Sequence, residues 1–121
     1  MLDLEELSAG LRLVASELGM DVELHDAALR ASLRESENLA EDVYEMPAAL
    51  CYALGRNPRA LGHGFHALGV ISIRAQALAS GVRLNLSLDE LAVILGDVRE
   101  HKLSYESVRD RFAENMHMFA G

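Results

Sequence analysis

One short segment of the chain, residues 56–66, gathers the residue types that bind anions. Its candidate site residues are two arginines, two histidines and two glycines: Arg56, Arg59, Gly62, His63, Gly64 and His66. Arginine guanidinium groups make charge-assisted, often bidentate hydrogen bonds to phosphate oxygens. A glycine-containing loop that leads into a helix adds backbone N–H groups and the positive end of the helix dipole. The loop therefore predicts a site for a phosphate or a similar anion.

The distribution of charge along the chain favours the same prediction. The 121 residues include 11 Lys and Arg against 19 Asp and Glu, a formal net charge of −8, which disfavours general binding to nucleic acids or anionic membranes. Residues 46–88, however, contain four arginines and no acid, so this segment carries +4 and the rest of the chain −12. An alternative interpretation is that acids are missing because the segment forms core, and that the loop arginines are merely solvated.

The two histidines of the loop suggest further chemistry. His63 and His66 are three residues apart, a spacing that metal sites use, but nothing in the sequence brings a third ligand near them. We therefore predict no metal site. His63 is the candidate general base, because an imidazole ordinarily titrates near neutral pH. The single cysteine, Cys51, falls on an apolar helix face and is interpreted as core packing.

Length and composition predict one cytoplasmic domain over residues 1–121. This length is enough for one hydrophobic core and too short for two. A lone cysteine excludes an intrachain disulfide and is typical of a reducing compartment. The N-terminus begins with acidic residues, the wrong charge for a signal peptide. The longest weakly charged stretch, residues 60–78, contains two histidines, an arginine and three glycines, so we expect no membrane span.

Six helices are expected to position the loop. Apolar residues recur at spacings of three and four along most of the chain, which is typical of amphipathic helices. The expected helices cover residues 4–18, 24–35, 42–54, 65–79 and 88–99, with a sixth that begins after Ser104. Residues 82–86 alternate between apolar and polar and predict a short extended piece. The predicted fold class is all-α, a compact bundle of about six helices.

Particular residues set two of these helices. In the third helix, Val43, Met46, Leu50 and Leu54 are expected to line the buried face, and Pro47 to lie in the first turn or to kink the helix. The sequence Ser87-Leu88-Asp89-Glu90 predicts a capping box that opens the fifth.

The order of these features resembles the Doc toxins of the Fic/Doc (Fido) family along most of the chain. The matching segments are residues 24–26, 28–33, 42–46, 52–57, 79–84, 91–93 and 103–108. The resemblance implies a Fido-like helical fold and a toxin–antitoxin setting with a protein partner. It also implies transfer of a phosphoryl or adenylyl group from a nucleotide to a protein hydroxyl, with ATP and Mg²⁺ as cofactors. Residues 56–66 stand where the family has its catalytic loop.

The catalytic motif of that family is not kept in this loop. Active members carry HxFx(D/E)GNxR, in which the His is the base, the acid helps to hold the metal, and the Asn, Gly and Arg hold phosphates. Counting back from Gly81 places Arg59 at the His, Leu61 at the Phe, His63 at the acid, Gly64 at the Gly, Phe65 at the Asn and Ala67 at the Arg. Counting forward from Arg56 places Pro58 at the His, and the base, the acid and the Arg are again lost. The resemblance thus implies a catalytically degenerate member that still binds an anion or a partner protein.

Two alternatives stay open at this point. Arg56, Asn57 and His63 resemble the motif of small helical ribonucleases of the HEPN type, in which four to six residues separate an Arg from a His; six separate Arg56 from His63. That resemblance implies metal-independent RNA cleavage by a homodimer. The other alternative is a non-enzymatic interaction module, in which the helix over residues 4–18 or the segment 116–119 docks a partner such as an antitoxin-like peptide.

Overall fold

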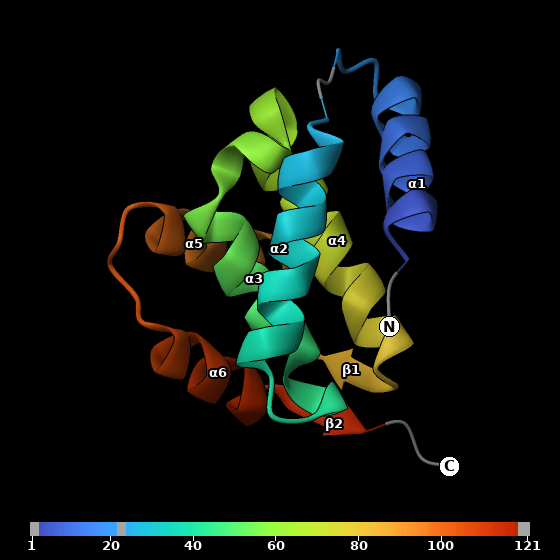
Figure 1. The fold of residues 1–121 in the computed structure, drawn as a ribbon. Coiled ribbons are helices and arrows are strands. Elements are labelled where there is room, and N and C mark those ends of the chain that lie inside the picture. The colour runs from blue at the N-terminus through green and yellow to red at the C-terminus, as the bar shows by residue number, and fades with distance from the viewer. Residues whose placement is uncertain (1–2, 22–23, 119–121) are drawn as a thin grey trace.

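The fold is a bundle of six helices with one small sheet (Figure 1). The computed structural model describes residues 3–21 and 24–118. The helices are α1 (Leu4–Glu17), α2 (Asp26–Leu39), α3 (Met46–Arg56), α4 (Phe65–Ala79), α5 (Leu88–Arg99) and α6 (Tyr105–Glu114). Three short 3₁₀ turns are η1 (Val43–Glu45), η2 (Pro58–Ala60) and η3 (Gly62–Gly64). The predicted all-α bundle of about six helices is confirmed.

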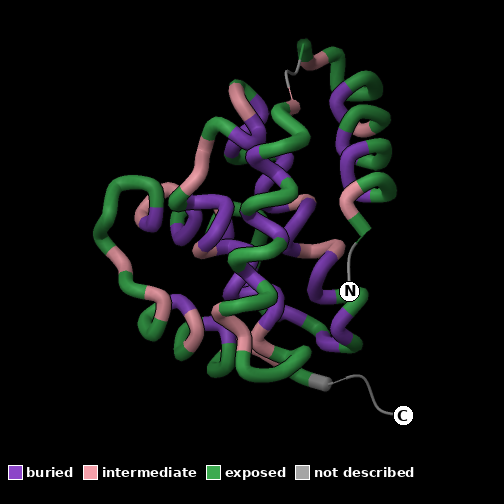
Figure 2. The backbone as a smooth tube through the Cα atoms, viewed as in Figure 1, coloured by how far each residue is buried: buried purple, intermediate pink, exposed green. Residues whose placement is uncertain are grey.

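Helices α3 and α4 form the centre of the bundle, and most of their residues are buried (Figure 2). Helices α2, α5 and α6 pack on α3, while α1 lies against α2 and α4 (Figure 1). Two glycines allow α5 to approach closely. A Cβ atom on Gly55 would lie 2.5 Å from Val98 Cγ1, and one on Gly69 would lie 2.4 Å from Leu95 Cδ2. Helix α5 therefore packs directly on both central helices.

The start of α3 differs from the sequence prediction. Asp42 Oδ1 accepts hydrogen bonds from the backbone N–H groups of Tyr44 and Glu45, at 2.9 and 3.1 Å, and this cap begins the 3₁₀ turn η1. Helix α3 follows with Pro47 in its first turn. Val43 is 46 % exposed, so its predicted place on the buried face was wrong. The reason is that the 3₁₀ turn rotates Val43 out of phase with the α-helical stripe.

The extended piece after α4 has a partner that the sequence did not indicate. Strand β1 (Val82–Leu84) pairs antiparallel with β2 (Met116–Met118), with Arg83 opposite His117. Strand β2 was missed because its pairing partner lies more than 30 residues away along the chain. The backbone of residues 116–118, considered above as a docking segment, is thus already paired with β1, and Phe119 lies outside the described residues.

Local capping fixes the last two helices. Ser87 and Glu90 form the predicted capping box, with Glu90 N–H donating to Ser87 Oγ at 3.1 Å and Ser87 N–H donating to Glu90 Oε1 at 3.2 Å. Ser104 caps α6 by accepting from the Ser107 N–H at 3.2 Å. Among the described helices, none combines the length and the apolar character that crossing a membrane requires.

Candidate functional site

The candidate loop folds as the two 3₁₀ turns η2 and η3, which use up part of its backbone donors. The N–H of Gly64 donates to the carbonyl of Leu61 at 3.1 Å. The N–H of Phe65 donates to the carbonyl of Gly62, whose φ of 55° is one that glycine adopts readily. The predicted phosphate cradle of backbone amides is therefore reduced, because these two N–H groups are already bonded inside the loop.

Helix α2 holds the loop in place. Asn57 Nδ2 donates to the carbonyl of Ala28 at 3.2 Å and to Ser32 Oγ at 3.4 Å. The His25 N–H donates to the carbonyl of Ala60 at 3.1 Å. Asn57, which we considered as part of a ribonuclease motif, thus turns its amide toward α2, where it anchors the loop.

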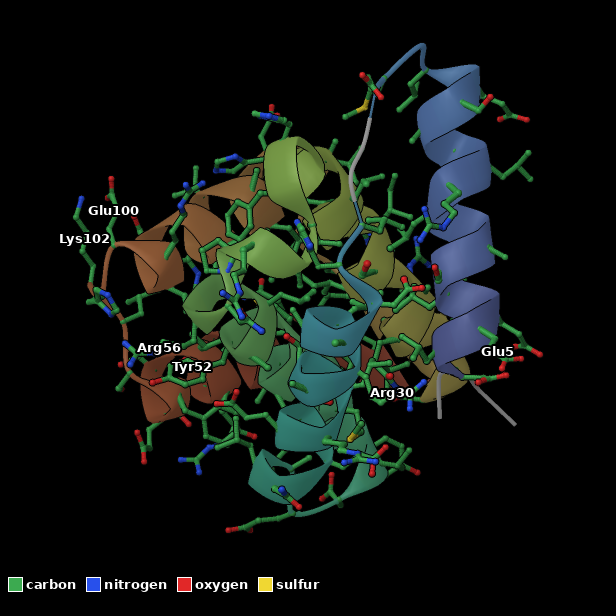
Figure 3. The ribbon with its side chains drawn as sticks, turned by 45° about the horizontal axis from the view of Figure 1, so that its top comes forward. Glu5, Arg30, Tyr52, Arg56, Glu100 and Lys102 are labelled. Atoms are coloured by element: carbon green, nitrogen blue, oxygen red, sulfur yellow. The ribbon has the colours of Figure 1, made fainter. Side chains whose placement is uncertain are left out.

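The C-terminal end of α5 reaches both sides of the loop. His101, in the turn after α5, contacts Arg56 Nη1 through its Nδ1 atom. Arg99 lies over the ring of Phe65, with 4.9 Å from Cζ to the ring centroid, a cation–π contact. Figure 3 shows Arg56 on the same side of the molecule as Glu100 and Lys102. Residues 56–66 and 99–102 together therefore form one surface, which we call the basic end.

A groove of about 590 Å³ opens beside His66, between the start of α4 and the second half of α5. Its lining residues are His66, Ala92, Val93, Gly96, Asp97, Arg99 and Glu100. A Cβ atom on Gly96 would lie 3.4 Å from His66 Nε2, so Gly96 lies directly beside this imidazole. Pockets that hold small-molecule ligands typically measure about 300–1,000 Å³, and this groove falls in that range.

The arginines of the basic end lack acidic partners. Within the described residues, no carboxylate lies within 4.0 Å of Arg56, Arg59 or Arg99. The ion pair found here joins Lys102 Nζ to Glu100 Oε2 at 2.9 Å. That pair lowers the pKa of the Glu100 carboxyl and raises the pKa of the Lys102 ammonium, through their hydrogen bond first. Within the described residues no carboxylate thus neutralises these three guanidinium groups, although Arg56 contacts His101 and Arg99 lies over Phe65.

Two of these arginines also have a structural explanation. Arg56 lies in the last turn of α3 and Arg99 in the last turn of α5, where positive charge complements the helix dipole. Arg59, by contrast, lies in the 3₁₀ turn η2 and is exposed. It is therefore the arginine whose presence the fold explains least.

Neither loop histidine belongs to a group of metal-ligating side chains within the described residues. His63 is exposed, and its side chain makes no hydrogen bond within the described part of the chain. His66 packs edge-on against Phe65, with 5.0 Å between ring centroids. No three His, Cys, Asp or Glu side chains among the described residues come together as metal ligands would.

The positions that align with the Fic/Doc motif carry the wrong side chains in space as well as in sequence. Phe65, at the position of the phosphate-binding Asn, is 2 % exposed and belongs to the core. Ala67, at the position of the Arg, is exposed and too short to reach a ligand.

Cys51 is fully buried, and burial raises the pKa of its thiol far above the ordinary value, which makes it an unreactive core residue.

Sequence reasoning missed two residues of the basic end, Arg99 and His101, because they lie more than 30 residues from the loop. The one local sign was Gly55 beside Arg56, since a glycine inside a helix often marks a close approach to another element. No protein-family model, curated protein or solved structure matches this chain. The Doc-like resemblance and the site residues that it implies stay predictions.

Proposed function

We propose that this chain is a Doc-like binding module that has lost group-transfer chemistry and holds a phosphate-bearing ligand at its basic end. The observation that carries the proposal is the set of three arginines, Arg56, Arg59 and Arg99, that belong to the loop or contact it without a carboxylate partner in the described structure. In this proposal the module acts in the cytoplasm, in a toxin–antitoxin pair with a protein partner.

The side chains of the loop support binding more than catalysis. Guanidinium groups present several N–H donors in a fixed plane, which suits phosphate oxygens. The groove beside His66 has the volume for a nucleoside attached to those phosphates. A nucleotide is therefore the ligand class that we propose, with its phosphates at the arginines.

The cofactors that the resemblance implies fit this site unequally. The phosphate groups of ATP suit the arginines, because guanidinium groups bind phosphate oxygens. Mg²⁺ favours carboxylate oxygens, but residues 56–66 contain none, and of the two that line the groove, Asp97 and Glu100, the second is paired with Lys102. Group transfer also needs a base and a metal ligand positioned at the phosphates, and Arg59 and His63 stand at those two positions. The loop therefore fits a nucleotide without a resident Mg²⁺.

Thermal unfolding with ATP, ADP, GTP and pyrophosphate, each with and without Mg²⁺, tests the proposal. A ligand present at 100 times its Kd raises the free energy of unfolding by about 2.7 kcal/mol. Arg59→Ala is expected to weaken binding about tenfold, because it removes a charge-assisted contact. Arg30→Ala is the matched control, since Arg30 is exposed on the opposite side of the molecule (Figure 3).

The outcome that contradicts the proposal is equally defined. If none of these ligands stabilises the wild-type chain, the basic end binds no phosphate. That result would favour the alternative of a non-enzymatic module that docks a partner protein. If Arg30→Ala weakens binding as much as Arg59→Ala, the ligand responds to net charge and not to this site.

The ribonuclease alternative is tested with the same proteins. Arg56 and His63 are both exposed on one loop, which is the observation in its favour. Its signature is cleavage of RNA in the presence of a chelator, abolished by Arg56→Ala. Absence of cleavage by the wild-type chain contradicts it, whatever the nucleotide experiment shows.

A further inference from the structure

A second, smaller pocket lies at the other end of α3, between η1, α3 and α6. Its volume is about 200 Å³. Its lining residues are Asp42, Tyr44, Glu45, Ala48, Arg109, Phe112, Ala113 and Met116. Pockets for whole small-molecule ligands begin at about 300 Å³. This pocket is therefore too small for a nucleotide and has room for one long side chain.

The walls of this pocket are apolar below and acidic at one side. Ala113 and Met116 give the pocket its accessible apolar surface, while Ala48 and Phe112, which also line it, are buried. Asp42 and Glu45 come from η1 and the residue before it. An apolar stem with a cationic head, as in lysine and arginine, matches both parts of such a surface.

One oxygen of each carboxylate is already held in place. Asp42 Oδ1 caps η1, and Glu45 Oε1 accepts a hydrogen bond from the Tyr105 hydroxyl at 2.7 Å. The second oxygens of the two carboxylates, Asp42 Oδ2 and Glu45 Oε2, make no hydrogen bond within the described residues. Neither carboxylate has a cationic partner within 4.0 Å there. Two oriented carboxylates thus keep an acceptor each for an incoming cation.

The cation that the pocket itself contains is paired elsewhere. Arg109 Nε lies 3.3 Å from Asp110 Oδ1, and this hydrogen bond is the main reason why the pKa of Arg109 is raised. The charge of Arg109 also interacts with Glu45 over a longer distance. With Arg109 and Asp110 balancing each other, Asp42 and Glu45 leave the rim negative.

We propose that this pocket receives a lysine or arginine side chain of a partner protein, with the stem on Ala113 and Met116 and the head between Asp42 and Glu45. Charge complementarity favours this occupant, because the rim is negative and the chain as a whole carries −8. The inference is independent of nucleotide binding at the basic end.

Titration of the ¹⁵N-labelled protein with three peptides tests the proposal. The first is acetyl-Gly-Gly-Lys-Gly-Gly-amide. In the second norleucine replaces the lysine, which keeps the stem and removes the charge, and in the third 2,3-diaminopropionate keeps a charge and removes the stem. We expect amide shifts at Ala48, Ala113 and Met116 with the first peptide, and binding about tenfold weaker with the other two.

Three variants sharpen the experiment. Ala113→Phe fills the pocket, while Ala31→Phe makes the same change on α2, and both positions are exposed, so both variants should fold. The lysine peptide is expected to lose its binding to the first variant and to keep it with the second. Glu45→Gln retains an acceptor for the Tyr105 hydroxyl and removes the charge, so it should weaken the lysine peptide about tenfold and leave the norleucine peptide unchanged.

Any one of three results overturns the proposal. The first is no shift at about 10 mM peptide, tenfold above a Kd of 1 mM. The second is equal binding of the lysine and diaminopropionate peptides, with shifts spread over the acidic surface. The third is unchanged binding to Ala113→Phe, which would place the peptide elsewhere.

Discussion

Helix α3 joins two surfaces of opposite charge, and they are held in different ways. At its N-terminal end Asp42 and Glu45 accept hydrogen bonds from the backbone and from Tyr105. At its C-terminal end Arg56 has the single contact with His101, and Arg59 has no hydrogen bond within the described residues. Both arrangements complement the dipole of α3, so the sign of charge alone does not identify a site.

The packing beneath the two ends differs as well. The acidic end rests on Phe112, a large and fully buried side chain of α6. The basic end depends on Gly55, whose missing side chain lets α5 bring Arg99 and His101 to the loop. A large buried side chain therefore supports the acidic end, and a glycine allows the close packing of α5 that the basic end needs. Substitutions at Phe112 and Gly55 should therefore affect the two ends separately.

Phe112→Ala is expected to have the largest effect on stability. Removing a fully buried phenylalanine costs about 3–5 kcal/mol, because apolar contacts are lost and a cavity remains. The cavity would open under the acidic end and leave the basic end unchanged, so nucleotide binding should persist while the protein is folded. Urea unfolding measures the first effect and ligand titration the second. Leu13→Ala, at a 62 % exposed position, is the control and should change stability by less than about 0.5 kcal/mol.

Gly55→Ala tests the opposite end. The new Cβ atom would stand 2.5 Å from Val98 Cγ1 and 3.2 Å from the Leu95 carbonyl oxygen, so α3 and α5 must move apart. We expect a loss of about 1–3 kcal/mol together with weaker nucleotide binding.

Two further variants give this test its controls. In Gly96→Ala the new Cβ atom meets His66 Nε2 at 3.4 Å, an ordinary contact, and stability should be unchanged or slightly higher, because alanine favours helix. Adding Val98→Ala should make the double variant less destabilised than the sum of the single ones. Strict additivity would show that the contact of Gly55 with Val98 does not cause the loss.

Tyr105→Phe probes the hydroxyl that fixes Glu45. Losing a hydrogen bond to a charged group should cost about 1–2 kcal/mol at neutral pH. Burial, and then the bond to Glu45, raise the pKa of Tyr105 above its ordinary value of 10.0. The folded state thus keeps the proton where the unfolded chain loses it, so this contribution is present below pH 10 and falls as pH rises above it. Urea unfolding between pH 8 and 11 should show a steeper alkaline loss for the wild type than for the variant.

The parts of this molecule that sequence predicts well are those fixed by near neighbours. The helix over residues 65–79 and the capping box at Ser87 were predicted correctly, because both depend on residues a few positions apart. Val43 was misplaced, because the cap by Asp42 changes the helical phase, and β2 was missed because its partner is more than 30 residues away. The position of the loop as a basic surface followed from residue types alone.

The completion of the basic end could not be predicted in the same way. Arg99 and His101 reach the loop because Gly55 lets α5 pack on α3, a contact between segments more than 40 residues apart. Asn57 likewise lies in the candidate loop in the sequence, but its side chain donates a hydrogen bond to the backbone of α2. Residue types thus indicated the loop that we propose as a binding site, and only packing showed which side chains lie beside it.

Glu100→Gln should have the smallest effect of the four changes. Glu100 lines the groove at the basic end and pairs with Lys102, and both side chains are largely exposed. Removing its charge should raise the affinity for pyrophosphate about two- to threefold at low ionic strength. The repulsion between Glu100 and the anion is lost, and Lys102 no longer has a carboxylate partner. In 1 M salt, where the Debye length is about 3 Å, the difference should disappear. Glu5→Gln removes the same charge on the opposite side of the molecule (Figure 3) and should change nothing, since screening confines the effect to the groove. If both variants raise the affinity equally, the anion responds to net charge, and the contrast between the two ends of α3 has no local origin.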